Sequence, residues 1–145
     1  MLLDTQTLLW DATALSSDAV STNTYDLGVA GNSLSVGEPM CAVIQVDVAA
    51  DFTTGDETYQ FNLLQSANAN LSSADILSSI VRTAAQLTAG SLHVIPLPPG
   101  AETKRYLGLG YDGGGTTPTI TVTAWFAPMS MIQRDANYPD GFTIS

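Results

Sequence analysis

Catalysis would depend first on His93, the single histidine of the chain. A histidine acts as a general base when a hydroxyl nucleophile and an orienting carboxylate lie beside it. Side chains alternate between the two faces of a strand, so His93 would share a face with Ser91. No Gly-x-Ser-x-Gly motif accompanies this pair. We therefore interpret His93 as a strand residue with a local hydrogen bond, and we expect no enzyme activity.

Metal chemistry has few ligands to draw on. A zinc site needs several cysteine or histidine ligands, and the chain has one of each. Calcium prefers oxygen ligands from loops, which Asp51, Asp56 and Glu57 could supply around Gly55. Their spacing is not that of an EF-hand loop, so we interpret this segment as a solvated acidic turn, with a weak calcium site as the alternative. We predict no metal and no cofactor.

The glycine-rich segment 108–115 raises the question of phosphate binding. A dinucleotide-binding loop follows a strand and opens a helix, whereas here a threonine-rich strand follows the glycines. We instead predict a β-hairpin within residues 101–125, with strands at 106–111 and 119–124 and a turn at 112–115. In the second strand the threonines should face solvent, while Ile120, Val122 and Ala124 should face the core.

Four further strands are predicted, at residues 40–48, 59–65, 76–81 and 92–97. The continuous apolar start of segment 40–48, which includes Cys41, predicts burial on both faces; Ile44, Val46 and Val48 should then face inward. For residues 71–87 a continuous helix is the alternative to a strand followed by a helical turn at 84–87. Pro96, Pro98 and Pro99 each lack a backbone donor, which places segment 92–97 at a sheet edge or ends the strand early.

These segments together predict one all-β domain, an antiparallel jelly roll or β-sandwich of about seven or eight strands. We expect a body at residues 25–127, an extended N-terminal arm at 1–24 and a C-terminal tail at 128–145. The arm contains an apolar patch around Trp10, which should dock either on the body or on a neighbouring subunit. The tail is too apolar to be a simple solvated extension.

The charge balance excludes some partners. Fourteen acidic residues oppose four basic ones among 145 residues, for a net charge of −10. Nucleic-acid binding needs clustered Lys and Arg, so we expect none. Three of the four cations, Lys104, Arg105 and Arg134, flank the predicted hairpin and the tail. They should pair either with carboxylates of the same chain or with acidic groups on a partner.

Targeting signals are also not evident. The first residues lack the basic region and apolar core of a secretory signal peptide. No run approaches the roughly 20 apolar residues of a membrane span, so we expect no membrane partner.

Several segments, taken in order, resemble the capsid cement (decoration) proteins of tailed bacteriophages, of the type first described in a Bordetella podophage. The resemblance covers about residues 4–126, and the tail beyond Pro128 has no counterpart in it. The segments are Asp4-Thr5-Gln6, Trp10-Asp11-Ala12, Asp26-Leu27-Gly28, Gly37-Glu38-Pro39, Val43-Ile44-Gln45-Val46-Asp47, Phe61-x-Leu63-x-Gln65, Ala89-Gly90, Leu97-Pro98 and Arg105-Tyr106-Leu107-x-Leu109-x-Tyr111.

This resemblance implies a jelly roll on the outer surface of an icosahedral head, made in the cytoplasm of the bacterial host. It implies a homodimer or homotrimer that joins neighbouring major capsid protein subunits, with no catalysis and no cofactor. A carbohydrate-binding β-sandwich is the alternative, and exposed Tyr106, Tyr111 and Trp125 would support it. The expected capsid or oligomer contacts are Leu8, Leu9, Trp10, Lys104, Arg105, Met129, Met131, Ile132, Arg134, Tyr138 and Phe142.

Overall fold

Alternating apolar and polar side chains place most of the chain in strands. The computed structural model describes residues 7–29, 39–98, 100 and 103–129. In this part of the chain there are nine strands in two antiparallel sheets. The strands are β1 (Leu8–Leu15), β2 (Ala19–Val20), β3 (Tyr25–Asp26), β4 (Met40–Val48), β5 (Thr58–Ser66), β6 (Asp75–Arg82), β7 (Leu92–Pro96), β8 (Tyr106–Gly114) and β9 (Ile120–Pro128).

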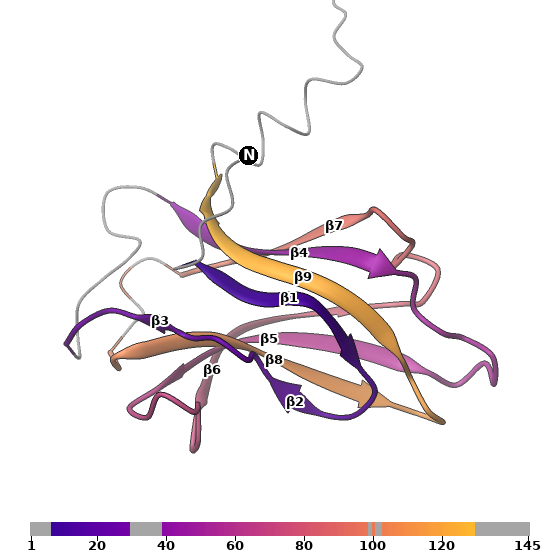
Figure 1. Ribbon diagram of the computed structural model, residues 1–145, viewed down its shortest axis with the longest axis horizontal. Helices are drawn as coiled ribbons and strands as arrows, with labels where there is room; N and C mark the ends of the chain where they lie inside the picture. Colours follow the sequence, from indigo (N-terminus) through magenta and orange to yellow (C-terminus); the bar gives the residue numbers. More distant parts are fainter. Residues whose placement is uncertain (1–6, 30–38, 99, 101–102, 130–145) are drawn as a thin grey trace, which may run out of the picture.

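The two sheets stack on each other as the layers of a sandwich (Figure 1). The four-stranded sheet has the order β1-β9-β4-β7, and the five-stranded sheet has the order β2-β8-β5-β6, with β3 also paired to β8. The pairs are nested along the chain: β1 with β9, β2 and β3 with β8, β4 with β7, and β5 with β6. This nesting is the jelly-roll arrangement, and it confirms the predicted all-β fold.

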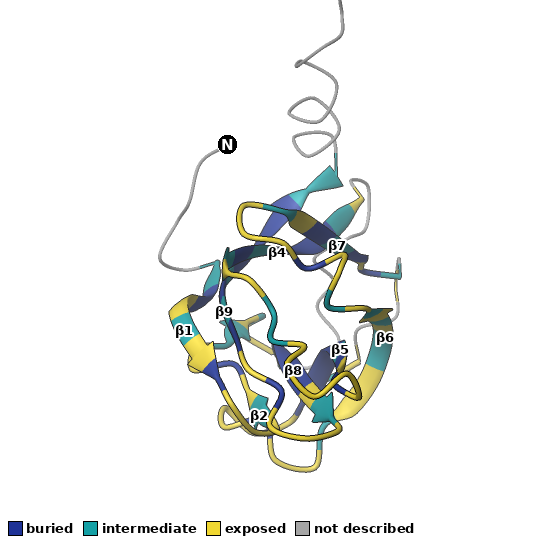
Figure 2. Cartoon of the chain, turned by 90° about the vertical axis from the view of Figure 1, so that its right-hand side faces the viewer, coloured by how far each residue is buried: buried dark blue, intermediate teal, exposed yellow. Residues whose placement is uncertain are grey.

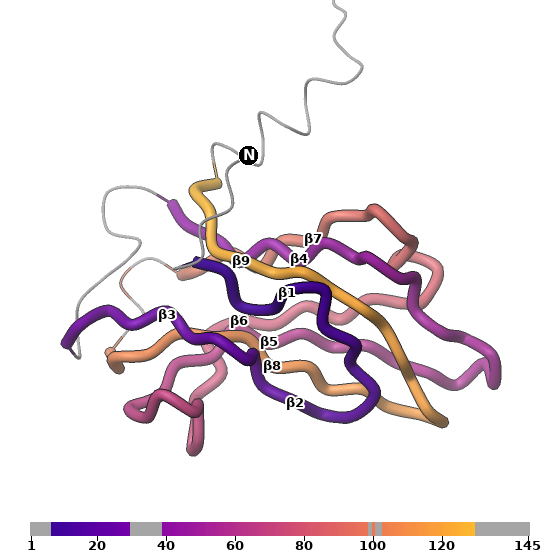
Figure 3. Tube along the Cα trace, in the orientation of Figure 1, coloured from indigo at the N-terminus to yellow at the C-terminus, as the bar shows by residue number. Residues whose placement is uncertain are grey.

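The predicted hairpin of residues 101–125 is wrong. Its two strands exist as β8 and β9, but they lie in different sheets, where β8 pairs with β5 and β9 pairs with β4. The intervening turn crosses from one layer to the other, as the tube in Figure 3 traces. Alternation predicted the faces of β9 correctly, because Ile120, Val122 and Ala124 are buried. It carries no information about which strand lies alongside.

The remaining strand predictions agree with the structure, with one exception. The first half of β4 is buried on both faces, and residues 75–82 form a strand and not a helix. The turn at 84–87 is present, with the amide of Leu87 donating to the carbonyl of Ala84 at 3.1 Å. Strand β7 lies at a sheet edge, as Pro96 predicted. The prediction that Val48 faces inward is wrong, since a register shift between Val46 and Val48 leaves Val48 59% exposed.

The buried residues of both sheets form the core, as the burial colours in Figure 2 show. This core is rich in aromatic side chains. Phe61 on β5 meets Trp10 edge-on, with ring centroids 6.4 Å apart, and lies 5.5 Å from the ring of Tyr111. Tyr59 extends this group, and its hydroxyl donates to the backbone carbonyl of Asp51. Such aromatic pairs add to the free energy of apolar burial through their edge and face geometry.

The N-terminal arm of residues 1–24 is also corrected. Residues 8–15 and 19–20 of that segment are β1 and β2, which pair with β9 and β8 in the two sheets. Residues 1–6 lie outside the described residues. The segment looked like an arm because register shifts on both sides of Trp10 break the alternation that marks a strand.

Substitution of Gly115 tests the turn between the two sheets. Gly115 has a φ of +85°, and a Cβ there would lie 2.2 Å from the carbonyl oxygen of Asp56. Gly55 has the same φ with no atom within 4 Å of a Cβ, so it is a matched control. Both alanine variants lose about 1–2 kcal/mol to the left-handed backbone. We expect Gly115→Ala to lose roughly 1–3 kcal/mol more, because overpacking adds to the strain. Denaturant unfolding measures both, and equal losses would contradict this account of the turn.

Candidate interaction surfaces

A second apolar cluster lies on the face of the four-stranded sheet that is turned away from the core. Along β4, Ala42 and Ile44 belong to the core, whereas the alternate residues Cys41 and Val43 belong to this outer cluster. Trp125 is at its centre and is 3% exposed. The full outer cluster is Leu8, Cys41, Val43, Val94, Trp125, Ala127 and Met129. The structure therefore brings two predicted contact residues, Leu8 and Met129, to one surface.

Cys41 is buried within this outer cluster, as predicted. Its thiol approaches the carbonyl oxygen of Ala127, with a sulfur to oxygen distance of 3.4 Å. Burial raises the pKa of the Cys41 thiol to about 11, so the group stays protonated at neutral pH. It acts here as a small apolar side chain and not as a nucleophile.

Leu9 and Trp10, also predicted as contact residues, are inside the core. Both side chains are fully buried, and neither reaches the surface for a neighbour. Successive residues can both point inward because the β1–β9 register shifts at this position. Trp10 was expected to dock either on the body of the domain or on a neighbouring subunit. In the structure it packs in the body of the domain.

Lys104 and Arg105 pair with carboxylates of the same chain, which is one of the two alternatives left open by the sequence. The ammonium of Lys104 lies 2.8 Å from an Asp75 carboxylate oxygen. The guanidinium of Arg105 donates hydrogen bonds to both carboxylate oxygens of Asp26, at 2.7 and 2.9 Å. The same guanidinium lies over the ring of Tyr106. The hydrogen bond from Arg105 lowers the pKa of Asp26 to about 2. These cations are engaged on the surface of their own chain.

The other predicted contact residues are Met131, Ile132, Arg134, Tyr138 and Phe142, and they lie outside the described residues.

His93 shares a face with Ser91, as predicted, but the pair is not arranged for catalysis. The Nε of Arg82 donates to His93 Nδ1 at 3.3 Å, so the imidazole proton sits on Nε2 and points to Ser91 Oγ at 3.0 Å. Ser91 in turn donates to the carbonyl of Thr88. Burial, followed by the charge of Arg82, lowers the pKa of His93. A catalytic triad needs a carboxylate at Nδ1 and a free lone pair at Nε2; His93 has a cation and a proton there.

The acidic turn binds its own backbone and hydroxyl groups. Asp51 accepts from the amide of Thr53, Asp56 accepts from the amide and hydroxyl of Thr116, and Glu57 accepts from the amides of residues 54 and 55. These bonds lower the pKa of Asp56, and the hydroxyl and amide of Thr54 lower that of Glu57 against its desolvation. Within the described residues, no three His, Cys, Asp or Glu side chains are placed to hold a metal ion.

The aromatic side chains that would support a carbohydrate-binding surface are largely covered. Tyr111 is a core residue at 2% exposure, and Trp125 lies in the outer cluster. Tyr106 is partly exposed under Arg105. The three rings do not form an exposed aromatic platform.

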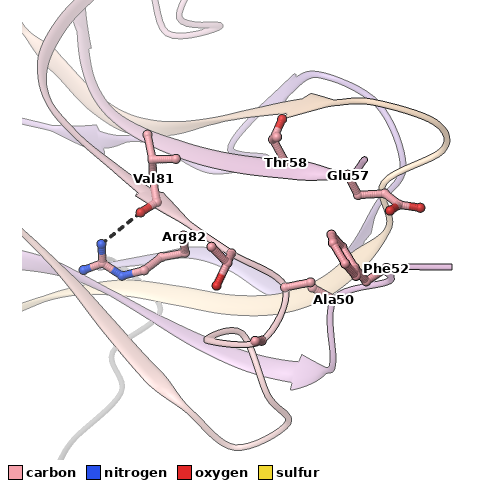
Figure 4. A pocket seen from close by; sticks show the side chains of 9 residues that line it. Ala50, Phe52, Glu57, Thr58, Val81 and Arg82 are labelled. Carbon is pink, nitrogen blue, oxygen red and sulfur yellow. Dashed lines mark hydrogen bonds between the residues drawn. The ribbon is translucent and has the colours of Figure 1, made fainter. Parts of the chain in front are cut away.

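An apolar groove that the sequence analysis missed lies beside the last residues of β6. It has a volume of about 390 Å³, and its walls include Ala50, Phe52 and Val81. Phe52 and Val81 are 55% and 62% exposed and lie on opposite sides of the groove (Figure 4). The guanidinium of Arg82 points away from it, toward the carbonyl of Val81, to which it donates at 3.1 Å. The groove is therefore suited to an apolar side chain.

One signal for this surface was present in the sequence. Segment 75–82 reads Asp-Ile-Leu-Ser-Ser-Ile-Val-Arg, with two pairs of adjacent apolar residues. A strand with one buried face cannot cover both members of such a pair. Leu77 and Ile80 pack against the core, so Ile76 and Val81, the other members of the two pairs, are left exposed.

The fold and these surfaces define a jelly-roll β-sandwich with an apolar outer cluster and one open apolar groove. The Bbp16 family model matches residues 9–125. The chain therefore belongs to the Bbp16 family, a family of Bordetella phage proteins. No curated protein matches the chain. None of the described residues form a helix that is long and apolar enough to cross a bilayer.

Replacing Trp10 by alanine distinguishes a core residue from a contact residue of an arm. Because the indole is fully buried, we expect Trp10→Ala to lower the free energy of unfolding by about 3–5 kcal/mol. Val48→Ala, at an exposed strand position, should change it by less than roughly 0.5 kcal/mol. Chemical denaturation of the purified chain measures both. An unchanged unfolding free energy for Trp10→Ala would place the side chain on an arm after all.

The pKa of Asp26 tests the surface ion pair. Its lowered value of about 2 means that its contribution to stability is present above its ordinary pKa of 3.8 and is lost as the pH falls through about 2. In Arg105→Ala we expect this pKa to rise toward 3.8, while the bond from the Gly28 amide keeps it somewhat lower. Carboxyl-detected NMR titration measures it. Lys104→Ala is the control, since Lys104 contacts Asp75, and a value for Asp26 unmoved in Arg105→Ala would contradict the assignment.

Proposed function

We propose that this chain is a capsid cement protein, which binds the outer surface of a bacteriophage head as a homo-oligomer and joins neighbouring major capsid protein subunits. The observation that carries this proposal is the Bbp16 family match over residues 9–125. That stretch lies within the segment of residues 4–126 whose ordered motifs resemble cement proteins. The jelly-roll topology is the fold that the resemblance implies.

The chemistry of the described surfaces supports a binding role over a catalytic one. His93 is held as a neutral hydrogen-bond donor to Ser91, with a cation and not a carboxylate at its other nitrogen. The acidic turn is occupied by its own Thr hydroxyls and backbone amides. Neither His93 nor the acidic turn therefore offers a general base beside a free nucleophile.

The position of the outer cluster supports a role for the tail in this binding. Strand β9 ends at Pro128, and Met129 after it packs on the outer cluster, so the last described residue lies against apolar side chains. The residues that follow include Met131, Ile132, Tyr138 and Phe142, which are types enriched at the centres of protein interfaces. Arg134 would contribute a cation to the same contact.

Binding of the full-length chain to heads that lack it tests the cement role directly. We expect the chain to co-sediment with such heads and to raise the temperature at which they break, because it ties adjacent shell subunits together. Tyr138→Ala with Phe142→Ala should weaken the binding by about 30-fold, the effect of losing interface anchors worth around 2 kcal/mol. Val48→Ala is the matched control on an exposed strand residue. Heads that bind none of the chain, or that break at the same temperature with and without it, would contradict the proposal.

A further inference from the structure

A hollow lies on the face of the five-stranded sheet that is turned away from the core. Phe61 and Leu63 of β5 belong to the core, so the alternate residues of this strand face outward. Asn62 of β5 is paired with Gly110 of β8, and Gly110 is paired with Val20 of β2. The middle strand therefore has no side chain between those of Asn62 and Val20. We call this hollow the outer slot. It has a volume of about 460 Å³, and its walls include Asp18, Val20, Asn62, Leu64, Gly110 and Asp112.

Two carboxylates at one end of the outer slot have no described cation beside them. Asp18 and Asp112 are both exposed, and an oxygen of Asp18 accepts a hydrogen bond from the amide of Gly113 at 3.0 Å. Burial raises the pKa of Tyr111, and the charges of Tyr59 and of both carboxylates raise it further, so the two carboxylates lie near the same hydroxyl. The three described cations are engaged elsewhere, two with other carboxylates and one with the imidazole. This end of the slot is therefore suited to a cation from a partner.

Asn62 supplies a polar group of the opposite kind. Its side chain is 8% exposed, and its Oδ1 accepts a hydrogen bond from Gln60 at 2.8 Å. Within the described residues, its Nδ2 donates to no protein acceptor. A largely buried N–H donor favours a ligand that brings an acceptor to it. The outer slot thus has a donor beside Gly110 and two acceptors at its end.

We propose that the outer slot binds an arginine side chain of the major capsid protein, presented on an exposed loop. The guanidinium donates to Asp18 and Asp112, and the alkyl stem lies on Gly110. The backbone carbonyl of the same arginine accepts from Asn62. Residues two apart along a strand are about 6.6 Å apart, which matches the reach of an extended arginine side chain from Asn62 to the carboxylates. This inference rests on the proposed cement function for the identity of the partner.

The walls of the outer slot favour arginine over lysine. A guanidinium is planar and has five N–H donors, so it can donate to two carboxylates at once, whereas an ammonium acts as a compact point charge. The stem of an arginine also covers apolar surface while its head stays near water. Val20 is 42% exposed on one wall, and a Leu64 methyl group lies beside Gly110 on the other. Both ends of one side chain therefore find a matching environment.

Binding of N-acetyl-arginine amide to the isolated full-length chain tests the site without heads. We expect this probe to shift the NMR resonances of the Gly110 amide and of the Asn62 side-chain amide. The citrulline analogue has a similar shape without the charge, and it should bind at least about tenfold more weakly. Asp18→Asn with Asp112→Asn should weaken the arginine probe by about tenfold, because two half-exposed ion pairs are lost.

Binding to heads tests the partner. Asp18→Asn with Asp112→Asn should bind heads about tenfold more weakly than the wild-type chain does. Asp11→Asn with Asp47→Asn changes the net charge equally on the four-stranded sheet, and it is the matched control. A second variant, Val20→Arg, places a tethered cation beside the two carboxylates and should also weaken binding, whereas Val48→Arg, at an exposed position of β4, should not. Thermal unfolding of each variant checks the fold.

The outcomes separate the outer slot from the cement function itself. Equal binding of the arginine and citrulline probes, or equal losses in the slot variants and their controls, would overturn the site. A higher probe affinity in Arg134→Ala would show that the slot holds an arginine of this chain, which overturns the assignment to the capsid protein. Slot variants that bind heads normally would keep the cement function and remove the slot as its contact. A wild-type chain that binds the probe but no heads would keep the arginine site and remove the cement function.

Discussion

The packing of two sheets over one aromatic core is the constraint on which the rest of the structure depends. The core needs a partner for Phe61 from the opposite layer, and Trp10 at the start of β1 supplies it. Strand β1 can bring Trp10 there only by pairing with β9, close to the other end of the described chain. The jelly roll is therefore closed by its first and last strands, and the residues expected to form a free arm are part of this closure.

The sequence reveals the faces of strands far better than their neighbours. Alternation is a local property, and it gave the core-facing residues Ile120, Val122 and Ala124 of β9 and Ile44 and Val46 of β4. Pairing is set by the whole core, so the sequence of β8 and β9 could not show that a turn of five residues crosses between sheets. The predictions for Trp10 and Val48 failed for the same reason. Register shifts lie at both positions, and a bulge depends on the partner strand as well as on the local sequence.

For the candidate surface residues, the sequence predicted the kind of interaction but not the partner of each residue. A lysine or arginine in an acidic chain is expected to find a carboxylate, but the bidentate grip of Arg105 on Asp26 joins residues 79 positions apart. Carboxylates outnumber cations in this chain, and uncharged hydroxyl and amide donors form hydrogen bonds with several of them. Thr123 donates to Asp47, and Thr116 donates to Asp56. A chain with few cations can stay folded at a net charge of −10 because hydroxyls and amides satisfy its carboxylates.

The proposed cement role depends on several weak contacts acting together. A single weak contact with a dissociation constant of about 1 mM contributes roughly 4 kcal/mol, which is too little to hold one copy on a shell. When two copies are joined, the second contact forms within the same complex, and its effective concentration replaces the free concentration. Joined copies bind well only where two shell sites share their spacing, so the proposed homo-oligomer would also select positions on the lattice.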